Sequence, residues 1–271
     1  MARVLPNFTM RPEIDTVVDD VPADLDVQRR LSLVERLWAN ATVRRVLILV
    51  SLAVVWELYA LHTGNPLLFP RFSETLTALW EGIAHGPLLE RMASSLRVLL
   101  MGYGIGILLA GLLVTLAVST AIGQDVLSSL TAMFNPLPAI ALLPLALLWF
   151  GLGQASLVFV IVHSVLWAVA LNALSGFTSV NETLRMSGQN FGLRGVRYVM
   201  LILIPAALPS IIAGLKIGWA FAWRTLIAAE LVFGATSRSG GLGWYIYENR
   251  NQLETPSVFA GLLVVIIIGF R

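Results

Sequence analysis

The sequence contains no cysteine, and charged residues make up only 13% of its 271 residues. The absence of cysteine excludes disulfides, thiol catalysis and cysteine-ligated metals. Soluble domains carry about 25% charged residues, so this chain has roughly half the usual fraction. Lys216 is the single lysine, and the formal net charge of +2 is too small to indicate a nucleic-acid partner. These shortages exclude most soluble enzymes and nucleic-acid-binding proteins.

The sequence also lacks the phosphate-binding pattern G-x-x-x-x-G-K-[ST] and a set of carboxylates for Mg²⁺. The histidines His62, His85 and His163 are scattered, and no histidine–glutamate cluster or pair of acids falls within an apolar stretch. We therefore expect no catalytic residue, no metal and no cofactor in this chain. A membrane enzyme is disfavoured for the same reasons.

Apolar residues are abundant, at 57% of the chain, and they form six long runs rather than short alternating segments. A helix needs about 20 apolar residues to cross a bilayer, whereas barrel strands alternate over about ten. We therefore predict an all-α integral membrane protein with six transmembrane helices. The expected spans are roughly 46–61, 96–117, 127–150, 156–177, 208–233 and 257–271.

Arginine placement predicts the orientation. Arginines precede the first span and recur between the fourth and fifth, at Arg29, Arg30, Arg36, Arg44, Arg45, Arg185, Arg194 and Arg197. The positive-inside rule places these segments, and both chain ends, in the cytoplasm. We expect residues 1–44 to be a cytosolic tail, with a helix near 27–38 that lies on the membrane surface or in the cytosol, and residues 45–271 to be the transmembrane domain.

Glycines and prolines mark special places in the spans. Gly102 and Gly106 form a small-xxx-small pattern for close helix packing. Pro136, Pro138 and Pro144 predict a kinked third span, either beside a translocation path or as a device of packing.

Ionisable and polar residues in the spans are candidates for a pathway, because a charge within a bilayer is costly. Arg224 and Glu230 fall on different faces of the fifth span, and for both we favour a role in the pathway over a structural ion pair or a hydrogen bond to the backbone. In the fourth span, a polar stripe could face a cavity or another helix; it comprises His163, Ser164, Trp167 and Asn172. For His163 itself, a packing role is favoured over proton sensing.

The polar segment between the fourth and fifth spans is too hydrophilic to cross a membrane. Residues 182–197 predict a short helix and a turn, and Ser187, Gly188 and Gly192 would leave a smooth surface for another protein. Pro205 and Pro209 would then restart the chain into the fifth span. A helix fixed in this way can pass motion from a soluble partner into the membrane.

This segment resembles the cytoplasmic EAA loop of binding-protein-dependent ABC importer permeases. PAALP at 205–209 and AAELVFGATSRSGGLGWYIYENR at 228–250 are similar to the nitrate, sulfonate, taurine and bicarbonate group. The family's spacing places its glycine on Gly192 and its Glu-Ala-Ala on Met186, Ser187 and Gly188, so methionine replaces the glutamate. The other register, Glu182 with Gly188, leaves four extra residues before the proline.

The resemblance implies the type I importer fold, with a coupling helix between helices four and five, in the loop 180–204. It implies a permease of the bacterial inner membrane that moves a small anion by alternating access. Its partners would be a second permease, giving a homodimer, two cytosolic ATPases that carry the ATP and Mg²⁺, and a periplasmic solute-binding protein. Import of a vitamin precursor or an aromatic acid, and a stand-alone secondary transporter, are the alternatives.

The external loop 237–252 combines glycines with aromatic residues. Gly241, Gly243 and Trp244 are interpreted as part of a periplasmic gate or of a docking surface for the binding protein. The alternative for Trp244 is the belt of aromatic residues that lies at a membrane interface.

Overall fold

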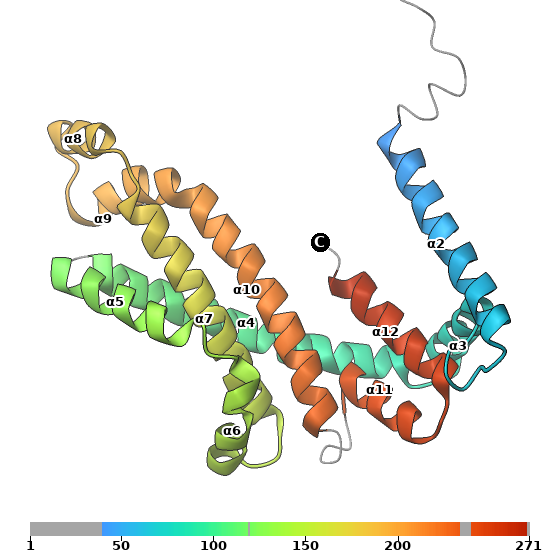
Figure 1. Ribbon diagram of the computed structural model, residues 1–271. Helices are drawn as coiled ribbons and strands as arrows, with labels where there is room; N and C mark the ends of the chain where they lie inside the picture. The colour runs from blue at the N-terminus through green and yellow to red at the C-terminus, as the bar shows by residue number, and fades with distance from the viewer. Residues whose placement is uncertain (1–39, 119, 234–239, 270–271) are drawn as a thin grey trace, which may run out of the picture. The chain divides into compact units, whose positions relative to one another are not determined.

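The structure is a computed structural model that describes residues 40–118, 120–233 and 240–269, and every element in these ranges is helical (Figure 1). The elements are α2 (Ala41–Thr63), α3 (Phe72–Ala84), α4 (Leu88–Val118), α5 (Ala121–Phe134), the 3₁₀ turn η1 (Ala139–Leu142), α6 (Leu143–Phe150), α7 (Gln154–Thr178), α8 (Glu182–Asn190), α9 (Gly195–Tyr198), the π-helical turn η2 (Val199–Leu203), α10 (Ile204–Phe233), α11 (Leu242–Asn251) and α12 (Thr255–Gly269). The helix expected near 27–38 lies outside the described residues.

The chain divides into two compact units, residues 1–54 and 55–271. In the first unit, the described residues 40–54 form the first part of α2, and nearly all their side chains are exposed. Most of these side chains are valine, leucine or isoleucine. A helix that exposes apolar residues on every side fits a lipid environment rather than water.

Four helical segments are long and apolar enough to cross a membrane: Ala41–Thr63, Leu88–Val118, Gln154–Thr178 and Val199–Val232. The bent pair Ala121–Phe134 and Ala139–Phe150 makes a fifth if it counts as one crossing. At the position of the expected sixth span, α12 is an apolar helix of 15 residues. By length, the described residues therefore supply four or five of the six expected spans.

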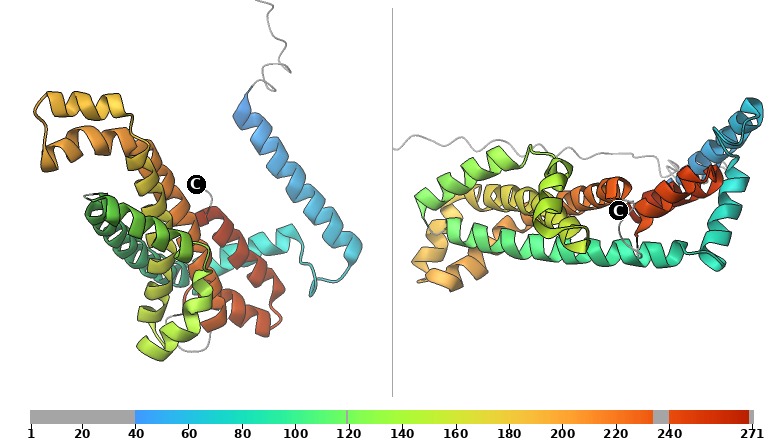
Figure 2. Two further views of the ribbon diagram at one scale, coloured as in Figure 1. Left: turned by 60° about the vertical axis from the view of Figure 1, so that its left-hand side comes forward. Right: turned by 90° about the horizontal axis from the view of Figure 1, so that it is seen from below.

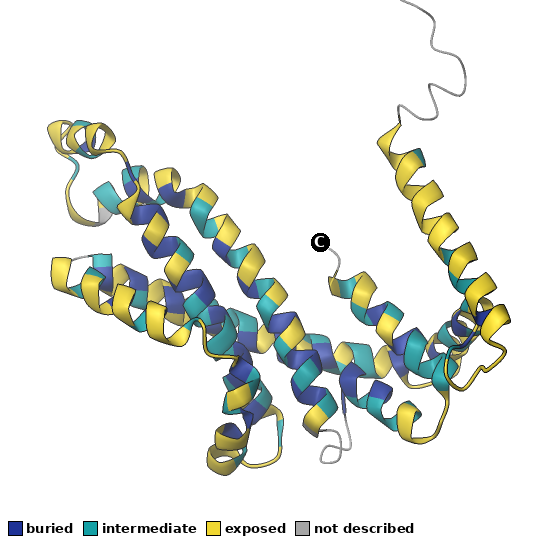
Figure 3. Cartoon of the chain, viewed as in Figure 1, coloured by how far each residue is buried: buried dark blue, intermediate teal, exposed yellow. Residues whose placement is uncertain are grey.

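The core of the second unit is the close packing of α4, α7 and α10 (Figure 3). A Cβ atom on Gly102 would lie 2.6 Å from Ile161 Cγ2, and one on Gly106 would lie 2.8 Å from Val165 Cβ. Both distances are too short for any residue other than glycine to fit without a shift. The expected packing role of these two glycines is therefore confirmed, and the packing holds α7 firmly against α4.

The expected third span is not one kinked helix. α5 and the pair η1–α6 meet at an angle of 86°. Pro136 and Pro138 explain the break, because each lacks an amide donor and pushes the preceding residue away from helical geometry. Pro144 behaves differently, since it lies in the first turn of α6, where no amide hydrogen bond is lost. The break leaves a bend inside the unit rather than a continuous crossing.

The chain does not restart at Pro205 and Pro209, as the sequence led us to expect. A helix already begins at Gly195, and Pro205 and Pro209 both lie within α10. The π-helical turn before Pro205 explains this: the amide of Ile204 donates to the carbonyl of Val199, five residues back. This wider turn relieves the crowding that a proline ring causes in a regular α-helix.

In the second unit, α4 and α10 run between two ends (Figure 1). In both views of Figure 2, the junction of α4 and α5 and the segments α8 and α9 lie at one end. α3 and α11 lie at the opposite end. Polar segments thus gather at the two ends, and apolar helices connect them.

Candidate functional site

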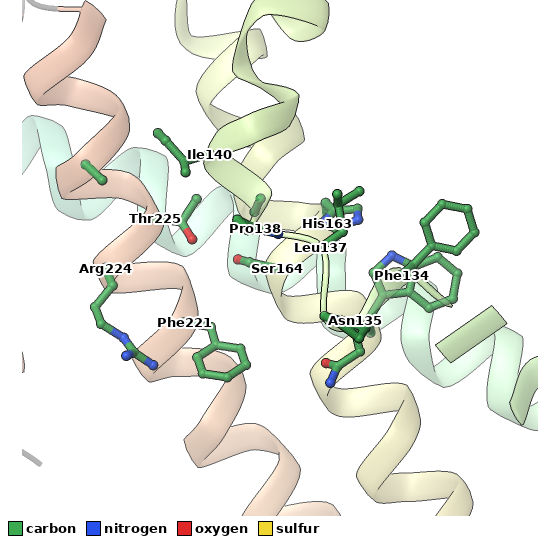
Figure 4. Close-up of a pocket in the computed structure, with 14 residues that line it drawn as sticks. Phe134, Asn135, Leu137, Pro138, Ile140, His163, Ser164, Phe221, Arg224 and Thr225 are labelled. Atoms are coloured by element: carbon green, nitrogen blue, oxygen red, sulfur yellow. The ribbon is translucent and has the colours of Figure 1, made fainter. Parts of the chain in front are cut away.

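A pocket of about 390 Å³ lies where α7, α10 and the break between α5 and α6 meet (Figure 4). Its wall is formed by residues 134–140 from the break, by His163, Ser164 and Trp167 from α7, and by Phe221, Arg224, Thr225 and Ala228 from α10. Three members of the expected polar stripe on α7 therefore face a cavity. The fourth, Asn172, is not in the wall, and its amide donates to the Ala168 carbonyl at 2.8 Å.

The proline-containing break forms one side of this pocket. Pro136 and Pro138 are both in the wall, whereas Pro144 is not. The chain between α5 and η1 is not helical, and its irregular backbone borders the cavity. Irregular backbone is tolerated at membrane depth where it lines a cavity or is buried in protein.

Arg224 supplies the charge in the described wall of the pocket. Its Nε donates to the Ala220 carbonyl at 3.2 Å, and its guanidinium carbon lies 5.0 Å from the centre of the Phe221 ring. Among the described residues, no carboxylate pairs with it. The terminal nitrogens of the guanidinium are therefore available to a bound molecule, in the fork geometry that suits oxyanions.

His163 adds polar atoms with unmet hydrogen-bonding capacity. Both ring nitrogens are buried and have no hydrogen-bond partner among the described residues. Its neighbours on the wall are aromatic: Trp167 lies at 6.3 Å between ring centres, and Phe134 stacks on Trp167 at 5.0 Å. Buried polar atoms almost always have a partner, so this imidazole marks a place for water or a ligand.

Together these groups form an apolar, aromatic pocket with one fixed positive charge. No aspartate or glutamate lies in its described wall. The hydroxyl of Ser164 donates to the Ile161 carbonyl at 2.8 Å. The oxygen of this hydroxyl also points toward the pocket (Figure 4). A few convergent polar groups in an otherwise apolar pocket are typical of sites for small molecules, and the charge here selects an anion.

Glu230 is not in this pocket, although we interpreted both Glu230 and Arg224 as pathway residues. It is 4% exposed, and its two carboxylate oxygens each lie 2.8 Å from the hydroxyl of Ser95 in α4. The amide of Gly243 donates to the same carboxylate at 2.8 Å, and the amide of Leu242 donates to the Ser95 oxygen at 2.7 Å. Glu230, which belongs to α10, therefore connects the start of α11 and α4 through hydrogen bonds.

Gly241 and Gly243 lie beside this hydrogen-bonded group and not on an open surface. Both are buried, and a Cβ atom on Gly243 would lie 2.6 Å from Glu230 Cβ. A Cβ atom on Gly241 would collide with the carboxylate of Glu230 and the hydroxyl of Ser95. The two glycines thus let the backbone of α11 approach the carboxylate. Trp244, by contrast, is partly exposed and stacks on Tyr247 at 5.4 Å.

A second, polar pocket of about 450 Å³ lies among α3, the start of α4 and α11. Arg91 organises it: its guanidinium donates to the Gly240 carbonyl at 2.9 Å and lies 3.8 Å from the carboxylate of Glu248. On the same wall, burial raises the pKa of the Tyr245 phenol, partly offset by a hydrogen bond with Ser257. Tyr245 is therefore neutral at physiological pH.

At the other end of the unit, α8 is fixed to the membrane helices. Arg185 donates to the carbonyls of Phe177 at 2.6 Å and Val180 at 3.2 Å, and so caps the end of α7. Gly188 is buried against Tyr198 and Ile202, so it does not contribute to the smooth outer surface that we expected. The exposed apolar side chains of this segment are instead Leu184, Met186 and Phe191, with Phe191 83% exposed.

Gly192 ends the helix in the left-handed region, with a φ of 76°, and no atom lies within 4 Å of a Cβ placed there. Its role is to turn the chain from α8 toward α9, since other residues are strained at such an angle. Ser187 is partly buried. Sequence reasoning missed the capping role of Arg185 and the partnership of Ser95 with Glu230. A basic residue just after a helix end was a usable signal for the former.

Most of these helices match the model of a known protein family. Residues 102–270 match the model of the family described as "Binding-protein-dependent transport system inner membrane component". The matched region contains all the residues that line the Arg224 pocket, together with α8.

Curated relatives are similar over most of their length. A taurine transport system permease protein of Escherichia coli is 32% identical over 82% of this chain and 81% of its own. A protein of the same species named as an aliphatic sulfonates transport permease is 28% identical over 81% and 82%, respectively. A nitrate import permease protein of Synechocystis is 26% identical over 91% of each chain.

Proposed function

The chain belongs to the family of binding-protein-dependent transport system inner membrane components and is a permease component of an ABC importer, and we propose that it carries a small anion past Arg224. The relatives are named for taurine, sulfonates and nitrate, all of which are anions or carry an anionic group. Bicarbonate belongs to the same chemical class. A stand-alone secondary transporter is not favoured by these relationships.

The observation that carries this proposal is the guanidinium of Arg224 in the pocket, without a carboxylate partner among the described residues. A fixed positive charge in an apolar wall attracts an anion and repels cations. The unpartnered nitrogens of His163 would supply a further donor to an oxygen of the anion. Weak binding by a few such groups suits a pathway, because the substrate must also leave.

The segment 180–204 is proposed as the coupling element to the ATPase. α8 would dock in a groove of the ATPase through the exposed side chains of Met186 and Phe191. Gly188 would hold α8 on Tyr198 and Ile202, with Ser187 beside it, and Gly192 would turn the chain toward α10. Arg185 would transmit displacement of α8 directly to the end of α7, which forms a wall of the pocket.

Pro205 and Pro209 lie at the start of α10, where the π-helical turn gives the helix an irregular first section. We propose that this section flexes when α8 moves, because π turns and prolines weaken the regular hydrogen-bond ladder. Two ATPase subunits that bind ATP and Mg²⁺ would drive this motion, one on each copy of a permease homodimer. The pocket would then open alternately to the two sides of the membrane.

For the topology we propose six crossings of the type I importer fold, with α5–α6 and α12 as the third and sixth. The amino terminus and α8 would face the cytoplasm, since arginines concentrate there. The opposite end, with α3, α11, Trp244 and the polar pocket of Arg91 and Glu248, would then meet the periplasmic binding protein. Gly241 and Gly243 would contribute there by holding α11 in place.

The test is whether an ABC ATPase associates with the chain through the exposed side chains of the α8 segment. The double substitution Met186→Glu and Phe191→Glu should abolish co-purification of the ATPase from membranes and its ATP hydrolysis in the purified complex. Leu152→Glu is the matched control, because Leu152 is 64% exposed in the turn between α6 and α7. Equal recovery of the ATPase with the double variant would contradict the docking role. A folded native chain that recovers no ABC ATPase would contradict the coupling proposal itself.

A further inference from the structure

Lys216 is the only lysine of the chain, and it lies near the middle of the apolar span Val199–Val232. Its side chain is exposed on α10, and it forms no ion pair or hydrogen bond with any residue in the described part of the chain. About four turns of helix lie on either side of it. The residues on both sides of it are mostly apolar, so the ammonium group lies within an apolar stretch of the helix.

A charged side chain within an apolar stretch is costly to place against lipid, since it would remain without partners in hydrocarbon. Such residues border a water-filled cavity or pair with another charge. The described acids of the chain offer no partner within its own unit. Glu230, the buried acid of α10, is occupied by Ser95 and by the amide of Gly243.

Lys216 shares a face of α10 with Arg224. The spacing of eight residues, with Ala220 between them, places both cations within one side of the helix, about 12 Å apart along its axis. Lys216, Ala220 and Arg224 are all exposed, whereas Gly214, Gly218 and Ala222 on the other side are buried in the core. The guanidinium of Arg224 lies back along the helix toward Lys216, because its Nε contacts the Ala220 carbonyl at 3.2 Å.

We propose that Lys216 is a second anion-binding station, to which the substrate passes from the pocket of Arg224 on its way toward the α8 end of the unit. This inference rests on the proposed function, and it adds a site and a direction to it. The expected ligand is a small oxyanion such as a sulfonate, nitrate or bicarbonate. Lysine fits a transfer station because its ammonium is a mobile point charge, whereas the fork of Arg224 gives the more directional first contact.

The single lysine makes a direct chemical test possible. A water-soluble, amine-reactive ester added to membranes that contain the full complex can label this chain only at Lys216 and at its terminal amine. Mass spectrometry of the peptide with Lys216 should show labelling in at least one nucleotide state. Ethanesulfonate or nitrate should reduce that labelling, and an uncharged sugar at the same osmolarity should not. Absence of labelling in every nucleotide state would overturn the proposal, because it would place Lys216 in a dry interface.

Substitution gives the second test, in the complete complex reconstituted in proteoliposomes. Lys216→Met should lower ATP-driven import of taurine or nitrate about tenfold or more, the size expected for a lost charge-assisted contact. Lys216→Arg should restore most of the import, and Ile217→Met, at the exposed neighbouring position, should have little effect. ATP hydrolysis and complex assembly should remain unchanged in all three variants.

These outcomes separate the inference from the proposed function. If the native complex imports one of these anions and Lys216→Met imports it equally well, the station is disproved while the importer proposal stands. If Lys216→Met fails to assemble although Lys216→Arg assembles, Lys216 is an interface ion pair and the inference is wrong. If the native complex hydrolyses ATP but imports none of the anions, the proposed substrate class fails, and labelling still decides whether Lys216 borders water.

Discussion

The hydroxyl of Ser95 lies 2.8 Å from both carboxylate oxygens of Glu230, and its oxygen also accepts the Leu242 amide at 2.7 Å. One small side chain of α4 thus connects this helix to α10 and α11, whose contacting residues lie 135 and 147 positions further along the chain. Because the group is buried, each of these hydrogen bonds replaces a bond to water that the folded chain cannot make. Loss of the hydroxyl leaves a buried carboxylate and a buried amide with fewer partners.

Ser95→Ala should therefore destabilise the protein by roughly 1–3 kcal/mol, the cost of buried groups left unsatisfied. The measurement is thermal unfolding of the purified permease in detergent, where the midpoint should fall. Ser129→Ala is the control, because the Ser129 hydroxyl is exposed and bonds only to the Asp125 carbonyl of its own helix. Equal midpoints for Ser95→Ala and the native chain would show that the hydroxyl does not hold α11.

Two glycines in α4, one buried against α7 and one in open space, allow a matched test of how closely α4 and α7 pack. Gly102→Ala would place a Cβ atom 2.6 Å from Ile161, whereas Gly104→Ala meets nothing within 4 Å. Overpacking should destabilise the first variant by roughly 1–3 kcal/mol. The second should be neutral or stabilised by up to about 1 kcal/mol, because alanine favours helices over glycine. Similar stability of the two variants would contradict the close contact between α4 and α7.

Arg185→Gln should loosen α8 from the end of α7. The variant loses a positive charge near the last carbonyls of α7 and two hydrogen bonds, with an expected cost of roughly 1–2 kcal/mol. Hydrogen exchange of the α8 amides should become faster, while exchange in α4 stays the same. Arg197→Gln, at an exposed position of α9, is the control. Unchanged exchange in α8 would show that Arg185 does not fix it.

Sequence reasoning succeeded where short-range patterns determine the structure. The apolar runs predicted helices near the observed α2, α4, α7, α10 and α12, and the spacing of Gly102 and Gly106 predicted a tight helix contact. The polar stripe from His163 to Trp167 faces a cavity, which was one of the two interpretations left open. Each of these results depends on helical periodicity, which a single sequence displays directly.

The remaining features depend on contacts between distant residues, which periodicity does not contain. Prolines suggested a kink in the third span, but not that the helix ends and resumes at 86°. The contact of Glu230 with Ser95 could not be read from the sequence, because the two residues are 135 positions apart. We expected Gly188 on an outer surface, but it is buried against Tyr198 and Ile202. These contacts arise only when the chain folds back, so the local sequence does not show them.

The most direct test of the account is ATP-driven import by the complete complex with Arg224→Gln, compared with Arg224→Lys. Arg224→Gln should import taurine or nitrate about ten to one hundred times more slowly, as expected for the loss of a charge-assisted hydrogen bond of 1.5–3 kcal/mol. Arg224→Lys should retain part of the activity, and both variants should still hydrolyse ATP in response to the loaded binding protein. Import by Arg224→Gln at the native rate would contradict the claim that the anion passes this pocket.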